Sequence, residues 1–296
     1  MRVMPRRHRR FDIGRRRFLI AGATGTAVVL AAAFSETYGF RVTRHGIGLP
    51  GLAAPLRVAL LTDLHFGPFI PLASVRDWVR ATAREAPDLI VVAGDLVDYR
   101  SGRDPSGLVA ALARLRAPLG SYAVWGNHDH RHFHDPAALA AFGDSLGRHG
   151  IEVLTNRNVV LRSDVVLAGI DDLRTGRPDL PAALAGRPAG ACTLLVSHNP
   201  DILPQVPADV ALTLSGHTHG GQVCLPGIGP IVTNSRYGRR FAAGLVHGPA
   251  LGYVSRGLGV TGIPLRIDCP AELAILDLTP LAPTAPDLGP ARAEGA

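Results

Sequence analysis

Residues 57–65 read RVALLTDLH, and this stretch decides the fold class. An uninterrupted aliphatic run from Val58 to Leu61 is typical of a strand buried on both faces, as in a largely parallel sheet. Asp63 and His65 follow at the point where the run ends. In open α/β sheets ligands bind beyond the carboxyl ends of the strands. The stretch therefore predicts a central strand that delivers two metal-binding side chains to a site.

The same pattern, a buried run followed by a polar cluster, recurs four times along the chain. The runs cover residues 89–93, 121–125, 193–196 and 208–214. The polar residues that follow them are Asp95 and Asp98, then Asn127, His128 and Asp129, then His198 and Asn199, and finally His217 and His219. Five strand ends of this kind are expected to converge on one crevice.

Helical patterns separate the first three of these strands, and more strands follow. Residues 74–84 predict a helix whose capping box is formed by Ser74 and Asp77, and Asp135 and Pro136 open another helix as N-cap and first residue. Closely spaced runs at 151–154, 159–161 and 165–169 predict a meander. Helices early and strands late indicate an α/β protein with more than one sheet.

The residue types at the strand ends suit a pair of divalent metals. A mixed set of imidazole and carboxylate ligands fits borderline ions. Asp63 and His65 are two residues apart, so an extended backbone would point both the same way. Asp63 and Asp95 bring two negative charges against the four positive charges of two ions. The excess of about two positive charges would attract a phosphate and support in-line displacement.

The five motifs, in order, are DxH, GDxxD, GNHD, SHNPD and SGHTHGGQ. The set resembles the calcineurin-like metallophosphoesterases, in particular a bacterial branch that carries an export signal or membrane anchor, and covers about residues 55–278. The resemblance implies an α/β fold, a layered β-sandwich of two mixed sheets flanked by helices. It also implies a hydrolase that acts on phosphoric esters.

The resemblance further implies a role for each motif residue. Asp95 would bridge the metals, and a hydroxide between them would be the nucleophile. The first metal would be held by Asp63, His65, Asp95 and His219, and the second by Asp95, Asn127, His198 and His217. His128 would protonate the leaving oxygen, and Asp129 would orient His128. Purple acid phosphatases carry a ligand tyrosine three residues after the bridging Asp, where this chain has Asp98. Two redox-inert ions are therefore expected, with Mn²⁺ preferred over Zn²⁺ or Fe²⁺.

Several polar residues near the motifs have two interpretations each. Asp98 is expected to orient a ligand or to form a turn, and Asn199 and Gln222 to hydrogen-bond beside the ligands. His130, His132 and His134 either line the site or lie in a solvated loop, which is the preferred interpretation. Arg236, Arg239, Arg240 and Arg256 are either phosphate contacts or ordinary surface residues.

The N-terminus explains the charge of the chain. Residues 1–35 hold eight arginines and one acid, which accounts for the whole formal charge of +7. The remainder is formally neutral, so no nucleic-acid partner is expected. Arg15 and Arg16 resemble the pair of a twin-arginine export signal, and an uncharged stretch runs from Phe18 to Ser35. The segment is either a cleaved signal or an anchor at residues 18–34, unless it is a basic disordered terminus beside a buried helix.

The domain plan and function follow from these observations. Residues 1–35 form the signal or anchor, 36–54 a connector, 55–279 the phosphoesterase domain and 280–296 a disordered tail. We expect a phosphodiesterase or phosphomonoesterase that leaves by the twin-arginine machinery and works in the periplasm or at the cell surface on an envelope phosphoester. Hydrolysis of a phospholipid or of a nucleotide-lipid pyrophosphate bond is one alternative. A non-catalytic metal-binding envelope protein is another, which His128 disfavours because metal binding does not need it.

Overall fold

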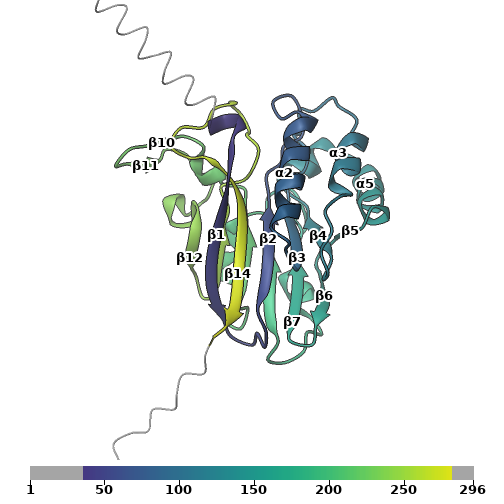
Figure 1. The fold of residues 1–296 in the computed structure, drawn as a ribbon, viewed down its shortest axis with the longest axis vertical. Coiled ribbons are helices and arrows are strands. Elements are labelled where there is room, and N and C mark those ends of the chain that lie inside the picture. Colours follow the sequence, from purple (N-terminus) through teal and green to yellow (C-terminus); the bar gives the residue numbers. More distant parts are fainter. Residues whose placement is uncertain (1–35, 282–296) are drawn as a thin grey trace, which may run out of the picture.

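The computed structural model describes residues 36–281, which form two six-stranded sheets packed face to face (Figure 1). The first sheet has the order β1-β14-β2-β3-β4-β5 and is mixed, since only the β14–β2 pair is antiparallel. Its strands are β1 (Phe40–Leu49), β14 (Ala271–Pro280), β2 (Leu56–Leu61), β3 (Leu89–Ala93), β4 (Ser121–Val124) and β5 (Ile151–Val153).

The second sheet has the order β12-β13-β9-β8-β7-β6 and is antiparallel only at its two edges. Its strands are β12 (Gly244–His247), β13 (Leu251–Val254), β9 (Leu212–Ser215), β8 (Cys192–Val196), β7 (Val165–Gly169) and β6 (Arg157–Arg162). A small separate hairpin pairs β10 (Cys224–Leu225) with β11 (Gly229–Pro230).

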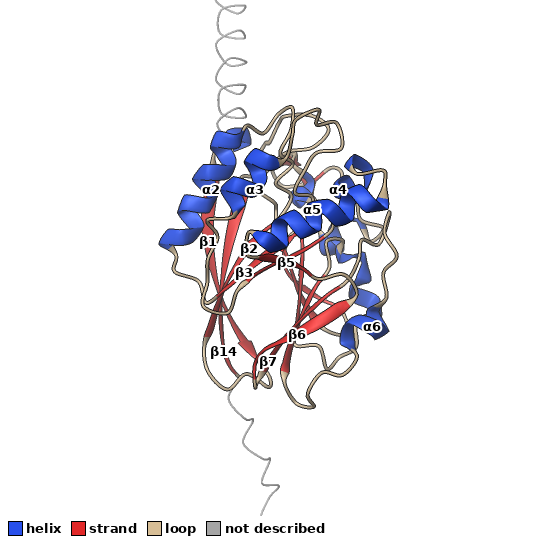
Figure 2. Cartoon of the chain, turned by 90° about the vertical axis from the view of Figure 1, so that its right-hand side faces the viewer, coloured by secondary structure: helices blue, strands red, loops and turns tan. Residues whose placement is uncertain are grey.

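Helices cover the outer face of each sheet (Figure 2). The first sheet is covered by α2 (Leu72–Arg84), α3 (Ser106–Leu112) and α5 (Pro136–Arg148), and the short α4 (Asn127–His132) follows β4. The second sheet is covered by α6 (Leu180–Leu184) and the 3₁₀ turn η1 (Pro200–Gln205), and two further 3₁₀ turns are η2 (His219–Gly221) and η3 (Gly238–Phe241). No helix within residues 36–281 is long and apolar enough to cross a bilayer.

Strand β2 explains why its sequence is apolar without alternation. Val58 and Leu60 point into the core between the two sheets, whereas Ala59 and Leu61 point into the core beneath the helices. Full burial of one such Leu or Val side chain stabilises the fold by ~1.5–3 kcal/mol. The predicted α/β sandwich of two mixed sheets flanked by helices is confirmed.

The connector predicted at residues 36–54 is wrong in its central part. Residues 40–49 form β1, which pairs in parallel with β14 from Phe40↔Ala271 to Leu49↔Pro280. Its residues are mostly exposed or half-buried, as expected of an edge strand, and Gly46 and Gly48 weaken the strand signal. The sandwich therefore begins near residue 40 and not at 55. Residues 282–296, most of the predicted tail, lie outside the described residues, as does the signal at 1–35.

Two local predictions are also corrected. Helix α2 begins at Leu72, after Pro71 as N-cap, and no side chain caps it, so the capping box of Ser74 and Asp77 is wrong. Asp77 instead pairs with Arg80 one turn later. By contrast, the predicted cap of α5 is confirmed, because the Asp135 carboxylate accepts the Ala137 N–H at 3.0 Å.

The predicted meander after residue 150 is divided between the sheets. Strand β5 lies parallel to β4 in the first sheet, whereas β6 and β7 form an antiparallel pair in the second. Short apolar runs carry no information on which sheet they join, because their partners are distant in sequence.

Candidate metal centre

All seven predicted metal ligands follow the carboxyl ends of five strands. Three of these strands, β2, β3 and β4, are parallel neighbours in the first sheet, and β8 and β9 are parallel neighbours in the second. The ligands after them are Asp63 and His65 (β2), Asp95 (β3), Asn127 (β4), His198 (β8), and His217 and His219 (β9). All seven residues are buried. They lie together at the end of the sandwich where the carboxyl ends of these strands from both sheets meet.

The backbone at the ligands differs from the extended geometry expected at Asp63 and His65. These two residues have φ of 53° and 47°, and Asp95, His217 and His219 also have positive φ. Such conformations cost of order 1–3 kcal/mol each for residues other than glycine and gather at functional sites. Hydrogen bonds between neighbouring turns hold them, since Asp63 N donates to Gly94 O at 3.0 Å and His65 N to Asp95 O at 2.9 Å.

The first group of donors surrounds the Nε2 atoms of His65 and His219, which lie 3.0 Å apart. Asp63 Oδ1 lies 3.3 Å from His219 Nε2, and Asp95 Oδ2 lies 3.5 Å from His65 Nε2. Together Asp63, His65 and His219 form a group of ligand atoms close enough to hold one ion.

The second group surrounds His198 Nε2, which lies 3.2 Å from both Asp95 Oδ2 and His217 Nδ1. The ring orientation of His198 is fixed because its Nδ1 lies 2.8 Å from Ala93 O. Asn127 Oδ1 is buried and has no hydrogen-bond partner among residues 36–281. A buried polar atom of this kind is destabilising unless it is paired, so the donor set fits a bound cation.

The electrostatics of the donors also fit metal binding. Burial lowers the pKa of His65 to about 3 and holds the pKa values of His217 and His219 well below the ordinary range, so these imidazoles stay neutral, as ligands must. Burial raises the pKa of Asp63 to about 6, against the effect of His198. Burial also lowers the pKa of His198, but Asp95 outweighs it and the pKa rises to about 10. Asp63 thus lacks compensation that a cation would provide, whereas His198, against the effect of burial, compensates Asp95 and helps to hold the pKa of Asp95 well below its ordinary value.

Two glycines of the motifs allow neighbouring side chains to lie close to the backbone. A Cβ on Gly126 would overlap Asp95 Oδ1, and a Cβ on Gly216 would overlap Thr62 Oγ1 and Asp63 Oδ2. Neither glycine has positive φ, so the left-handed backbone region is not the reason for a glycine at either position. They are needed because ligand side chains occupy the space where a side chain would stand.

The predicted acid, His128, lies beside the first group, but its expected partner is corrected. The His128 ring meets the His65 ring edge-on, with centroids 4.4 Å apart. Its Nδ1 faces Asp98 Oδ2 at 3.7 Å, and His65 Nδ1 lies at the same distance from that oxygen. Asp129 instead accepts the backbone N–H groups of Val97 and Gly126 at 3.0 and 2.9 Å. Asp98, not Asp129, is therefore the carboxylate beside the His128 ring.

The donors open into a cavity of about 600 Å³, and its mouth carries charge and apolar groups. Asp95, Asn127, His128, His217 and His219 line its floor. Arg131 and Arg174 line it higher up, together with Tyr99, Ile231, Val232 and Ile263. The cavity can therefore place a phosphoryl group between the donors and two guanidinium groups.

Sequence reasoning missed two arginines near the donors. Arg174 follows β7, so the strand-end rule applied to residues 165–169 would have found it. Arg266 is fully buried and donates to the carbonyl groups of Arg256 and Gly259 at 2.8 and 2.7 Å. Its Nη2 lies 3.5 Å from His219 Nδ1. No motif marks it, because most of its partners are backbone carbonyl groups.

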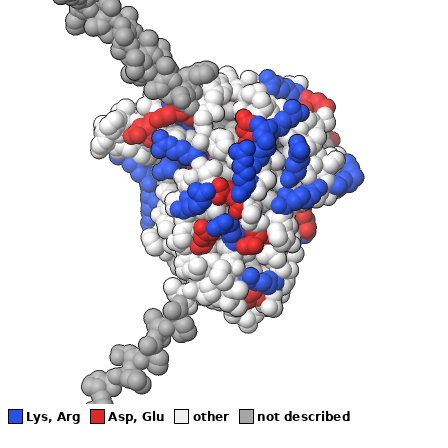
Figure 3. All heavy atoms as spheres, viewed as in Figure 1, with Lys and Arg blue, Asp and Glu red and all other residues white. Residues whose placement is uncertain are grey.

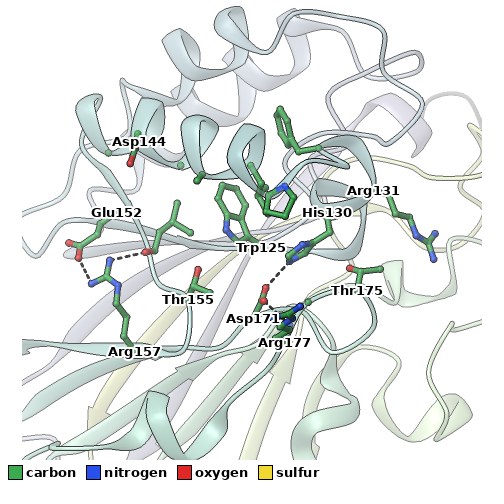
Figure 4. A pocket seen from close by; sticks show the side chains of 18 of the residues that line it. Trp125, His130, Arg131, Asp144, Glu152, Thr155, Arg157, Asp171, Thr175 and Arg177 are labelled. Carbon is green, nitrogen blue, oxygen red and sulfur yellow. Dashed lines mark hydrogen bonds and ion pairs between the residues drawn. The ribbon is translucent and has the colours of Figure 1, made fainter.

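The solvated loop preferred for the three histidines after His128 is wrong for the first two of them, His130 and His132, which are half-buried in a helix. Residues 127–132 form α4, and His130 Nε2 lies 2.7 Å from Asp171 Oδ1 (Figure 4). The pair stands at one end of a second groove of about 1190 Å³, between α5 and the segment from β5 to β6. Arg131 lines both this groove and the metal cavity. The pair thus connects α4 to the loop that carries Arg174.

The remaining polar residues have local partners. Asn199 caps η1 by accepting Asp201 N–H at 3.0 Å, and Gln222 donates to Thr261 O and Ile263 O at 3.1 Å each. Arg236, Arg239 and Arg240 are exposed and outside the lining of the metal cavity, so the surface interpretation fits them. Arg256 lies 3.8 Å from Glu272 through its guanidinium and is outside that lining as well.

Comparison with known proteins gives a consistent result. A family model described as calcineurin-like phosphoesterase matches residues 56–221. YkuE of Bacillus subtilis (strain 168), an uncharacterized metallophosphoesterase, is 30% identical over 283 residues, covering 90% of this chain and 98% of its own. The phosphodiesterase YaeI of Escherichia coli (strain K12) is 32% identical over 279 residues, covering 90% and 99%. A solved 5'-nucleotidase precursor from Thermus thermophilus aligns with 76% of this chain and 54% of its own, at 16% identity and a TM-score of 0.48.

Proposed function

Because this chain belongs to the calcineurin-like phosphoesterase family, we propose that it hydrolyses a phosphodiester or phosphomonoester of the cell envelope at the metal centre described above. That the protein is a metal-dependent phosphoesterase follows from the family and from its buried His/Asp groups. The envelope substrate, the choice between diester and monoester, and the residue roles are the proposed part. A diester is preferred, since the relative YaeI is named a phosphodiesterase.

The position of Asp95 carries the proposal. Its Oδ2 lies 3.5 Å from His65 Nε2 in one donor group and 3.2 Å from His198 Nε2 in the other. A carboxylate within reach of both groups supports the proposal that each group would hold one ion and that Asp95 would serve both. We assign Asp63, His65, Asp95 and His219 to the first ion and Asp95, Asn127, His198 and His217 to the second. Two ions held there would supply Lewis acidity and an activated water.

The side chains of the chain itself perform the remaining steps. Arg131 and Arg174 bind the non-bridging phosphoryl oxygens and hold the phosphorus in line. Water gives one proton to solvent, and its oxygen forms a new P–O bond while the bond to the leaving oxygen breaks. His128 gives that oxygen a proton, and the negative charge of Asp98, whose Oδ2 lies 3.7 Å from His128 Nδ1, stabilises the charged form of the ring. Burial outweighs the nearby carboxylates and holds the pKa of His128 below its ordinary value, so only the minor protonated fraction of the ring serves as the acid at neutral pH.

For the metals we propose Mn²⁺, with Zn²⁺ or Fe²⁺ as alternatives. A ferric centre of the purple kind would use a tyrosinate after the bridging Asp. The tyrosine nearest the site, Tyr99, packs its ring 4.9 Å from the His128 ring instead, and Asp98 fills the position before it. A mixed oxygen and imidazole set supports borderline divalent ions.

The envelope location rests on the N-terminal sequence, which lies outside the described residues. We propose that residues 1–35 direct the enzyme through the twin-arginine machinery, and that 18–34 act as a cleaved signal or as an anchor. A phospholipid or nucleotide-lipid pyrophosphate is the alternative substrate, favoured by the apolar side chains at the cavity mouth.

The test measures hydrolysis of bis(p-nitrophenyl) phosphate and p-nitrophenyl phosphate by protein loaded with Mn²⁺, Zn²⁺ or Fe²⁺. We expect diester turnover that EDTA abolishes, and Asp95→Asn should lower both metal content and turnover. Asp144→Asn, an exposed carboxylate in the second groove, is the matched control and should change neither. Folded, metal-loaded protein that hydrolyses neither ester would support the non-catalytic alternative and refute the enzyme assignment.

A further inference from the structure

An unusual share of the exposed aliphatic side chains surrounds the mouth of the metal cavity. Ile231, Val232 and Ile263 line the mouth and are 57%, 61% and 67% exposed. Leu225 and Ile228, 40% and 54% exposed, continue the surface along the β10–β11 hairpin. We call these five residues the apolar rim. A contiguous exposed apolar patch marks a surface that meets another apolar phase or a partner.

The rim is a built structure and not a loose loop. Cys224 N donates to Ile267 O at 2.9 Å, and Val223 and Ile267 form a bridge, so the hairpin is tied to the loop that carries Ile263. Gln222 fixes the same loop by accepting Thr261 N–H at 2.8 Å. The hairpin projects from the sandwich in Figure 1 and its outer tip is uncharged in Figure 3.

The start of the described chain lies beside the rim. Thr37 Oγ1 accepts the Arg266 backbone N–H at 2.9 Å, within the loop that follows Ile263. Residue 35, which ends the uncharged stretch from Phe18, is two residues earlier and thus at most about 7 Å of chain away. Any membrane-inserted segment that ends there would bring the rim to the bilayer surface.

The charge of this part of the chain fits an anionic surface. No Asp or Glu occurs between Asp209 and Asp268, a stretch that contains the hairpin and the loop, and the exposed Asp268 is the acid at its border, next to Ile267. The exposed arginines of the same stretch are Arg236, Arg239 and Arg240. Aliphatic side chains flanked by arginine are the combination that binds the interface of anionic bilayers.

We propose that the apolar rim docks onto an anionic lipid bilayer, so that the mouth of the metal cavity faces the membrane. The docking does not depend on the chemistry of the site. Its consequence, that the phosphoester reaches the site from the bilayer, rests on the proposed function. A second copy of this chain seated on the rim is the competing occupant.

The test uses tryptophan as a depth probe in the full, metal-loaded chain. The two native tryptophans, Trp78 and Trp125, are buried, so a new surface tryptophan reports its own environment. Ile228→Trp places it on the rim, and Val160→Trp is the matched control on β6, at 50% exposure and remote from the rim. Vesicles of phosphatidylglycerol and phosphatidylcholine with brominated acyl chains quench only tryptophans that enter the bilayer.

We expect brominated vesicles to lower the Ile228→Trp fluorescence about two-fold and to leave Val160→Trp almost unchanged, because only the rim enters the interface. Adding Leu225→Glu to Ile228→Trp should remove most of the quenching. Quenching of neither probe, or equal quenching of both, overturns the proposal. A dimer in light scattering that Leu225→Glu dissociates, without quenching, would assign the rim to a second copy.

Hydrolysis of a soluble diester by the same samples separates the two proposals. Leu225 and Ile228 do not line the metal cavity, so their variants should keep normal soluble turnover. Normal quenching in a protein without turnover refutes the proposed function alone. Normal turnover without quenching refutes the docking alone.

Discussion

At the scale of single residues, His128 separates catalysis from metal binding. Its Nδ1 faces Asp98 and its ring packs against His65, so it adjoins the donors without completing either group that we assign to an ion. A proton donor matters most when the leaving oxygen is a strong base, because such an oxygen cannot depart as an anion. A ligand or purely structural residue would affect all substrates alike.

The first prediction follows from this distinction. His128→Ala should lower kcat for alkyl phosphoesters by about 10²–10⁴-fold, and much less for p-nitrophenyl esters, whose leaving group departs readily without a proton. The measurement is a plot of log kcat against leaving-group pKa for wild type and variant. His134→Ala, an exposed histidine six residues later, should match wild type. An equal loss with every leaving group would contradict the role of His128 as acid.

The residues of the two donor groups could be predicted because each follows a strand end, which is a local signal. The carboxylate that lies beside His128 could not be predicted from the sequence. Neighbours in a helix do not face each other, so Asp129 turns to the backbone N–H groups of Gly126 and Val97. Asp98 comes from a different strand end, and only the parallel pairing of β3 with β4 brings it to His128. The positive φ angles of Asp63 and His65 could not be predicted from the sequence either, because the turns are set by hydrogen bonds to the neighbouring strand end.

At the scale of elements, Glu272 joins the two sheets. It lies on β14 of the first sheet and accepts hydrogen bonds from Thr43 on β1 at 2.7 Å and from Tyr253 on β13 of the second sheet at 2.8 Å. Arg256 N–H donates to its other oxygen at 3.0 Å. Burial alone would raise the pKa of Glu272, but these hydrogen bonds outweigh burial and hold the pKa below the ordinary value of 4.5.

The second prediction concerns stability against pH. A carboxyl group whose pKa is lowered by folding contributes stability above its unfolded pKa and loses it as the pH falls through the folded pKa. Glu272→Gln should therefore cost about 1–3 kcal/mol at neutral pH, the worth of hydrogen bonds to a charged group. The deficit should shrink below about pH 4.5, where wild type loses the same contribution.

Urea unfolding across this pH range measures the difference. Glu152→Gln is the control, since Glu152 is half exposed and pairs with the equally exposed Arg157. A deficit that stays constant down to the acid limit would show that Glu272 acts through shape and not through charge.

A helix or strand could be predicted from the sequence where consecutive residues alone define it. Strands β3 and β7 have the predicted bounds because both faces of each are buried and the aliphatic run is complete. Strand β1 was missed because an edge strand with one face in solvent reads as a polar connector. The assignment of β5 and β6 to different sheets depends on distant partners, which no local pattern encodes.

At the scale of the whole molecule, the formal charge of +7 lies in residues 1–35, the proposed export signal, and the remainder of the chain is formally neutral. The twin-arginine route exports proteins that are already folded, often with metal bound. Folding before export suits the metal centre, because its candidate ligands follow five strands of two sheets and form a site only after the chain has folded. A centre assembled inside the cell would also receive its metal there.

The last prediction tests the proposed twin-arginine export signal. Replacing Arg15 and Arg16 by Lys should keep the enzyme in the cytoplasm, because the pair is recognised as arginine and not as positive charge alone. Fractionation of cells that express the full chain, followed by immunoblotting and diesterase assay of each fraction, gives the location. The matched control replaces Arg9 and Arg10 by Lys, which keeps the same charge and lies outside the motif. Retention of both variants, or export of both, would mean that residues 14–19 are not the signal, and the envelope substrate would lose its main support.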